Sequence, residues 1–198
     1  MKKTVFIVVV FLITLSQAFT DENFGFFLDN DFRRNLEIFN IDKVRLDNFL
    51  LKADRIENHG DDSQYIDFIG NVCGIEEEKN IMFLSDRLRY DRKRKIILLE
   101  GNSTFEDKEK ELVAKSNFIE YDFREDIAVF KKQVRFFMDD MVCRSEFAVY
   151  RRIENLLDIS EFPVVFEKDN EYRADRIRID LETGDVAMES RLPGTIRN

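Results

Sequence analysis

The feature that most constrains this chain is a short pattern that recurs five times between residues 53 and 179. Each copy starts with a small residue, which a carboxylate or amide usually follows, and most copies have apolar residues three and five positions later. The small residues are Ala53, Ser85, Ser116, Ser145 and Ala174. They recur with a nearly constant period of about 30 residues, which is typical of stacked units that bury their apolar faces against one another.

Each copy leads through a polar turn into a segment of alternating apolar and polar residues. The turns occupy 92–95, 124–126, 152–155 and 182–185. Period-two alternation rich in Ile, Val, Phe and Tyr indicates β-strands, and no convincing helical period occurs beyond residue 50. The sequence therefore predicts an all-β fold, a solenoid-like β-jellyroll in which one face of each strand points into a continuous apolar interior.

Gly-Asn pairs interrupt two of the predicted strands at matching places. Residues 70–71 and 101–102 are interpreted as β-bulges or tight corners, because glycine inside a strand usually marks such a site. Residues 132–134 and 162–164 stand at the corresponding places of the later units. A shift in the parity of the apolar positions, as between Ser85 and Leu88, also predicts a corner.

The alternation predicts which side chains face inward. They are Ile66, Phe68, Val72, Leu88, Tyr90, Ile97, Leu99, Phe105, Ile119, Tyr121, Phe130, Val134, Phe136, Met138, Val164, Phe166, Ile177 and Ile179. Two interpretations fit them equally, a closed core and a groove that takes up acyl chains, since both need apolar inward faces. The 20 phenylalanines of the chain suit either one, because a Phe ring has no polar atom to satisfy.

The segment 1–18 is typical of a secretory signal peptide. Two lysines precede an apolar run over 4–15, and small residues stand where a signal peptidase cleaves, after Ala18. The run is shorter than the roughly 20 residues that a membrane span needs. We therefore expect export with cleavage after Ala18, then an N-terminal extension or irregular first strand over 19–45, and a single β-domain over 46–198.

The charge of the chain argues against nucleic acid as a partner. Cleavage would remove two lysines and no acid, so the formal net charge would change from −9 to −11. A diffuse negative charge repels phosphates. The stretch 85–102 does hold six Arg or Lys, but they divide between an outward strand face and one turn. We interpret them as solvated residues of one unit rather than as a binding track.

Catalysis has little support in the sequence. The aspartate pairs at 61–62 and 139–140 are expected to be solvated, because adjacent strand residues face opposite sides. The chain has no Ser-His-Asp set, HExxH motif, Gly-rich phosphate loop or metal-ligand spacing. We therefore expect no catalytic residue, metal or cofactor. A β-solenoid enzyme that cleaves polysaccharides would need several carboxylates on one exposed face, and the repeats do not supply them.

The two cysteines, Cys73 and Cys143, are interpreted as buried thiols. Two cysteines do not make a framework pattern, and these two lie far apart in the sequence. A disulfide between them is the alternative in an exported protein.

Three segments resemble the OstA-like/LptA family, which consists of periplasmic bridge proteins for lipopolysaccharide transport. They are YRADRIRIDLETGDVAMES (172–190), LKADRIEN (51–58) and DFIGNV (67–72). The resemblance implies a twisted, V-shaped β-jellyroll without enzymatic activity, in which the inward residues bind lipid acyl chains between two sheets. It also implies three partners: an envelope glycolipid such as lipopolysaccharide, an inner-membrane-anchored protein of similar fold, and an outer-membrane β-barrel assembly.

The two ends of the stack raise a separate expectation. Terminal strands, expected near residues 45–55 and 177–190, would present unpaired backbone groups. Pairing the last strand of one copy with the first strand of the next does not close, so an end-to-end homo-oligomer is expected. The residues leave open a second class of protein, a structural or adhesive envelope scaffold with a closed β core.

Overall fold

The computed structural model describes residues 44–46, 48–138, 141–168, 170–190 and 195–197. The expected signal peptide, and the expected extension up to residue 43, lie outside this part of the chain. The described residues form strands and one short 3-10 turn, η2 (Asp61–Ser63). The strands are β1 (Val44–Leu46), β2 (Phe49–Lys52), β3 (Arg55–His59), β4 (Tyr65–Glu76), β5 (Ile81–Asp91), β6 (Ile96–Asp107), β7 (Leu112–Asp122), β8 (Ile127–Met138), β9 (Met141–Arg151), β10 (Leu156–Ser160), β11 (Val164–Glu167), β12 (Asn170–Arg173), β13 (Arg176–Asp180), β14 (Val186–Glu189) and β15 (Thr195–Arg197).

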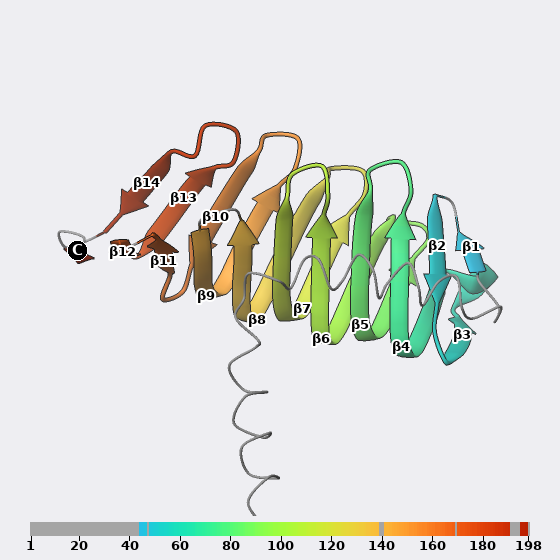
Figure 1. Ribbon diagram of the computed structural model, residues 1–198. Helices are drawn as coiled ribbons and strands as arrows, with labels where there is room; N and C mark the ends of the chain where they lie inside the picture. Colours follow the sequence, from blue (N-terminus) through green and yellow to red (C-terminus); the bar gives the residue numbers. More distant parts are fainter. Residues whose placement is uncertain (1–43, 47, 139–140, 169, 191–194, 198) are drawn as a thin grey trace, which may run out of the picture. The chain divides into compact units, whose positions relative to one another are not determined.

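The strands form a single antiparallel sheet in which most neighbours in space are neighbours in sequence. The main order is β1-β2-β4-β5-β6-β7-β8-β9-β10-β13-β14. Beside this path, β3 pairs with β4, β11 with β9 and β12, and β15 with β12. Figure 1 shows the long strands β4 to β9 stacked side by side in one row. The predicted all-β, solenoid-like β-jellyroll is confirmed.

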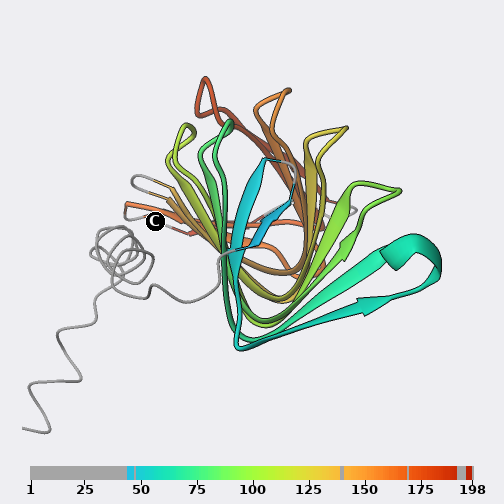
Figure 2. The same ribbon diagram turned by 90° about the vertical axis from the view of Figure 1, so that its right-hand side faces the viewer.

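Each long strand bends once, and the bends divide the sheet into two walls (Figure 2). The pairing register shifts at the bend in every pair from β4/β5 to β8/β9. Wall A consists of residues 65–69, 87–91, 96–100, 118–122, 127–131 and 147–151, with β3, β10, β13 and β14. Wall B consists of residues 72–76, 81–85, 103–107, 112–116, 134–138 and 141–145, with β1, β2, β11, β12 and β15.

The bends are β-bulges, as the Gly-Asn pairs predict. In β4, Gly70 and Asn71 have φ of 79° and 45°, and together they stand opposite the single residue Asp86 of β5. In β8, Lys132 and Gln133 adopt φ of 65° and 54° at the matching place. A strand that places two residues opposite one residue of its neighbour twists more strongly and bends at that point. Each bulged strand therefore passes from one wall into the other at its bulge.

The recurring sequence pattern stabilises these bends. The hydroxyl of Ser85 donates a hydrogen bond to the carbonyl of Arg87 at 3.0 Å, and the serines of the next two units make the same bond. The acid that follows Ser85 faces the bulge of the next strand, where Asp86 accepts a hydrogen bond from the amide of Asn102 at 3.0 Å. The pattern recurs because the same bend has to be built in each unit.

Tight hairpins connect the long strands at the free edges of both walls. At the end of β5, the carboxylate of Asp91 accepts hydrogen bonds from the backbone N–H groups of Lys93 and Arg94, both at 3.0 Å. Asp107 and Asp122 hold their own turns in the same way. Aspartate stabilises turns through such bonds to backbone groups two and three residues later. The predicted polar turns are therefore regular hairpins in one row along wall A, and the turns at 77–80 and 108–111 belong to the row of wall B.

The last bend lies one residue earlier than predicted. Glu161 and Phe162 carry the positive φ values, 59° and 63°, and the buried Pro163 follows them. The alignment of residues 162–164 with Gly-Asn-Val is therefore wrong, because 161–163 take that place. Neither glycine nor asparagine marks this bulge, which is why the sequence pattern misplaces it.

Gly101→Ala is expected to destabilise the fold more than Gly184→Ala, although the two glycines have similar φ, 75° and 78°. A Cβ at position 101 would clash with the carboxylate of Asp86, whereas a Cβ at position 184 would meet nothing within 4 Å. Both variants carry the backbone strain of a positive φ, and only the first also displaces Asp86. The free energy of unfolding, measured in urea, should fall by about 1 kcal/mol more in Gly101→Ala. Equal losses would contradict this role of the corner contact.

Candidate functional site

The interior between walls A and B is filled by inward side chains of both walls. Of the residues predicted to face inward, all but Val164 and Phe166 are at most 7% exposed. Phe105 of wall B packs on two rings of wall A, with centroids 5.4 Å from Tyr121 and 5.8 Å from Phe130. Such burial is expected of a closed core, and also of a groove whose walls close on each other when no acyl chain is bound.

In β11 the inward residue is Val165, and the prediction of Val164 and Phe166 is wrong. Val165 has no exposed area, whereas its two neighbours are half-buried. The ring of Phe166 lies on the other side of the strand, where the guanidinium of Arg144 is 5.5 Å from its centroid. The early bulge at Glu161 reverses the parity of the whole strand, since alternate residues face opposite sides.

Several interior side chains are absent from the predicted set. Tyr150 and Phe83 are almost completely buried, and both touch other rings of the interior. Tyr150 stands five positions after Ser145, which is the place of Tyr121 in the preceding unit, so the period itself could have identified it. Phe83 stands two positions before Ser85, so strand alternation places both side chains on the same face and could have identified Phe83 as an inward residue.

Opposite the bends, the two rows of hairpins meet along a line that we call the mouth. Hairpins 77–80 and 108–111 of wall B face hairpins 92–95, 123–126 and 152–155 of wall A there. At the bends the walls share continuous strands. At the mouth, the described residues make no backbone-to-backbone hydrogen bond from one wall to the other. The walls are therefore held together on this side by side chains.

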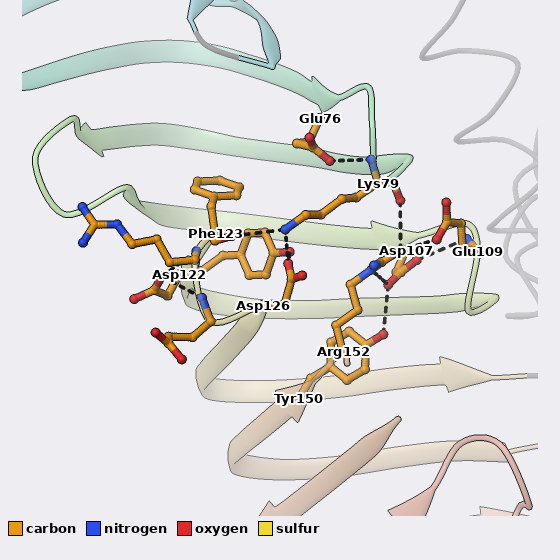
Figure 3. Close-up of polar contacts among 12 residues, drawn as sticks. Glu76, Lys79, Asp107, Glu109, Asp122, Phe123, Asp126, Tyr150 and Arg152 are labelled. Carbon is orange, nitrogen blue, oxygen red and sulfur yellow. Dashed lines mark hydrogen bonds and ion pairs between the residues drawn. The ribbon is translucent and has the colours of Figure 1, made fainter. Parts of the chain in front are cut away.

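Lys79 crosses the mouth from wall B to wall A (Figure 3). Its ammonium forms an ion pair with Asp126 and donates a hydrogen bond to the carbonyl of Phe123 at 3.2 Å. Lys79 and Asp126 are largely buried, with side chains 24% and 11% exposed. A contact shielded to this degree is less weakened by salt than a surface ion pair.

Arg152 crosses the mouth in the opposite direction, from wall A to wall B (Figure 3). Its Nε donates a hydrogen bond to Oδ2 of Asp107 at 2.8 Å, and its guanidinium also pairs with Glu109. Burial opposes the charge of Arg152, but the two carboxylates outweigh it and raise the pKa of the guanidinium. The guanidinium also donates to the carbonyl of Lys79 at 3.3 Å, which links the two crossings.

Two buried tyrosines hold the carboxylates from the interior side. The hydroxyl of Tyr121 donates to Asp126 at 2.5 Å, and that of Tyr150 donates to Asp107 at 2.9 Å. Burial, together with these neighbouring carboxylates, raises the pKa of both tyrosines far above the usual value, so the hydroxyls stay protonated. We call the whole set the mouth cluster. It consists of Lys79, Asp107, Glu109, Tyr121, Asp126, Tyr150 and Arg152.

A cavity of about 310 Å³ adjoins the mouth cluster and shares Lys79 with it. Aromatic rings and charged side chains of both signs line it: Asn48, Phe49, Glu76, Glu78, Lys79, Tyr90, Lys95, Phe123 and Arg124. The rings of Phe49 and Phe123, whose centroids are 4.2 Å apart, come from β2 in wall B and from a hairpin of wall A. Ligand-binding cavities span roughly 300–1,000 Å³, so this one lies at the small end of that range.

The basic stretch 85–102 contributes to the outer face of wall A. Asp67, which is 1% exposed, accepts hydrogen bonds from Arg87 at 2.5 Å and from Arg89 at 2.7 and 2.9 Å. The bonds from Arg89, aided by Arg87 and opposed by burial, lower the pKa of Asp67 to about 2. The predicted outward position of the two arginines is confirmed, and 92–95 form the turn that follows them.

Two further kinds of candidate group, the thiols and the possible metal ligands, can be followed in the described part of the chain. Cys73 and Cys143 are both buried and unpaired, and burial raises the pKa of each thiol to about 12. Among the described residues, no group of three or more His, Cys, Asp or Glu side chains is placed to hold a metal ion. In the same part of the chain, no helix is long and apolar enough to cross a membrane.

The fold is similar to that of a solved transport protein. No family model matches the chain, and a search of curated proteins gave no match. The structure of LptH from Pseudomonas aeruginosa, described as the LptA-homologous periplasmic component of the lipopolysaccharide transport device, matches with a TM-score of 0.54. The match covers 61% of this chain and 96% of LptH, at 12% sequence identity. The likeness shows that this chain has an LptA-like β-jellyroll fold.

Val165→Ala is expected to lower the free energy of unfolding by about 2 kcal/mol, because it removes a fully buried side chain from the interior. Val164→Ala, the matched control, should cost less than about 0.5 kcal/mol, since its side chain lies on the other face of the strand. Urea denaturation of the two variants checks the corrected parity of β11. A larger loss for Val164→Ala would restore the parity predicted from the sequence.

Proposed function

We propose that this protein is a non-enzymatic bridge that carries lipid through the periplasm, from the inner to the outer membrane. It shelters the acyl chains of lipopolysaccharide, or of a related envelope glycolipid, between walls A and B. The observation that carries the proposal is the way the walls are joined: they share strands at the bends but meet through side chains at the mouth. The likeness to the fold of LptH supports it.

The energetics favour an acyl chain as the guest. Parting the walls at the mouth breaks side-chain contacts and leaves the hydrogen bonds of the sheet intact. Burying an acyl chain against the inward phenylalanines gains about 0.8 kcal/mol for each methylene, so a twelve-carbon chain gains on the order of 10 kcal/mol. Parting the walls breaks two buried ion pairs, and about 3–5 kcal/mol for each, the penalty for deleting one partner, is an upper bound on that cost, so the gain is at least of the same size.

The remaining parts of the proposal concern the compartment and the partners. Residues 1–18 would direct export and be removed, 19–45 would form an extension, and 46–198 would act as the transport domain in the periplasm. Within the described part of the chain, strands β1, β3, β14 and β15 each pair with one neighbour only, which leaves both ends of the described stack open to further strands. Other copies of the chain, an inner-membrane-anchored protein of similar fold and an outer-membrane β-barrel assembly would bind there.

A structural or adhesive envelope scaffold is the second candidate, and the packing of the interior favours it. Phe68, Phe105, Phe130 and Phe136 have no exposed area, and Phe130 packs edge-to-face on Phe136 with ring centroids 4.9 Å apart. A core closed in this way is complete without a ligand. The two candidates differ in whether lipid ever reaches the inward side chains.

Photo-crosslinking in cells separates the two candidates. A benzophenone side chain replaces Phe68, Leu99 or Phe136, which face inward, or the control residue Phe118, which is 38% exposed on the outer side. A transport bridge should give adducts with glycolipid from the inward positions and few or none from Phe118. If no inward position gave a lipid adduct while the protein was folded and exported, the transport proposal would be wrong and the scaffold would stand.

Sedimentation velocity over a concentration series tests end-to-end assembly. We expect the apparent mass to keep growing with concentration, because a head-to-tail contact leaves a free edge on every oligomer. Met188→Pro in the edge strand β14 should stop the growth, because Met188 stands in a pair that exchanges no backbone hydrogen bonds with β13, so its N–H points to the free edge. A strict monomer, or one closed dimer at all concentrations, would argue against assembly by these ends.

A further inference from the structure

We infer that the mouth cluster is a latch: the crossings made by Lys79 and Arg152 hold walls A and B together, and parting them gives access to the apolar interior. The inference rests on the proposed function for what enters the interior. The opening and closing of the mouth is a property of the chain itself and is tested without a lipid.

The geometry of the two crossings supports a latch. Lys79 projects from wall B onto Asp126 of wall A, and Arg152 projects from wall A onto Asp107 of wall B (Figure 3). Separating the walls therefore breaks both ion pairs at once. The hydrogen bond from Arg152 to the carbonyl of Lys79 couples them further, so the mouth is expected to open as a unit rather than at one point.

The chemistry of the cluster favours a closure that can be reversed. Apolar residues of the same size would often close a buried contact at least as firmly as an ion pair, because charges lose their hydration when buried. On opening, water again solvates Lys79, Arg152 and their carboxylates, which offsets part of the lost attraction. A charged seam over an apolar interior is thus easier to open than a continuous hydrophobic core.

The position of the cluster leads directly to the interior. Tyr121 and Tyr150, which bond the latch carboxylates, also pack against Phe105 in the middle of the interior. The cavity beside the cluster shares Lys79 and already has aromatic rings in its lining. Releasing Lys79 from Asp126 would therefore open this cavity toward the apolar side chains between the walls.

The buried ion pairs of Asp67 and of Asp158 each lie within wall A, which makes them suitable controls. Arg89 of β5 donates two hydrogen bonds to Asp67 of β4, and both residues belong to wall A. Asp67 and Asp107 are equally buried, at 1% and 0% exposure. Arg89→Gln and Arg152→Gln thus remove the same kind of partner from the same kind of carboxylate, and only the second change affects the mouth.

The chain contains a natural reporter of opening. Cys143 lies on the inward face of β9, opposite Phe136, and has no exposed area. In a Cys73→Ser background, Cys143 is the single thiol. Its modification by iodoacetamide at fixed pH requires either separation of the walls or global unfolding. Urea distinguishes the two, because local opening exposes little surface and so depends weakly on denaturant.

We expect Arg152→Gln to speed the modification of Cys143 by about tenfold or more, with a weak dependence on urea. In Arg89→Gln the rate should follow the measured global stability, with the full urea dependence. The latch is refuted if both variants show the same rate and urea dependence once their global stabilities are taken into account. If Arg152→Gln does not fold, Lys79→Gln breaks the other crossing and is read in the same way.

Photo-crosslinking to lipid in the same variant tests the latch and the transport function separately. In cells, the glycolipid adduct at Phe136 should form faster in the Arg152→Gln protein than in the unaltered one. Fast modification of Cys143 without any lipid adduct would confirm the latch and reject lipid transport. Equal adduct yields, together with unchanged modification of Cys143, would keep lipid transport and reject the latch.

Discussion

The bend in each long strand is the constraint on which the rest of the structure depends. Because β4 to β9 pass through both walls, the walls cannot separate along the line of bulges without breaking the sheet. Paired positive φ values at Gly70-Asn71 and Lys132-Gln133 set this line. The walls can therefore separate only at the opposite edge, where the hairpins meet.

At that edge the chain uses charge where the interior uses aromatic rings. A purely apolar seam would extend the core to the surface and leave a hydrophobic stripe in water. Lys79, Arg152 and their carboxylates cover the rings instead, while Tyr121 and Tyr150 connect the two layers through hydroxyls that remain protonated. The same cluster thus shields the interior from water, and it joins the walls through side chains rather than through the backbone hydrogen bonds of the sheet.

The sequence could predict the fold and most of the interior because both follow from local patterns. Alternation assigns Phe68, Leu99 and Phe130 to the inside, and the period aligns the units without any knowledge of contacts. The alternation gives the wrong inward residues in β11. Glu161 and Phe162 form a bulge just before this strand without the usual Gly or Asn, so Val164 and Phe166 face the opposite side from the one predicted. The position of a bulge that lacks Gly and Asn depends on pairing with the neighbouring strand, so the residue types alone do not predict it.

By itself, then, the sequence determined that this protein is a stack of bent β-units with an apolar interior, because strand alternation and turn chemistry act over a few residues. Only the tertiary structure decided how that interior is closed. Lys79 meets Asp126 across 47 positions and Arg152 meets Asp107 across 45. These separations match no repeat distance, since each joins hairpins from opposite walls. Which charges meet depends on the twist and bend of the whole sheet, and no local pattern encodes that offset.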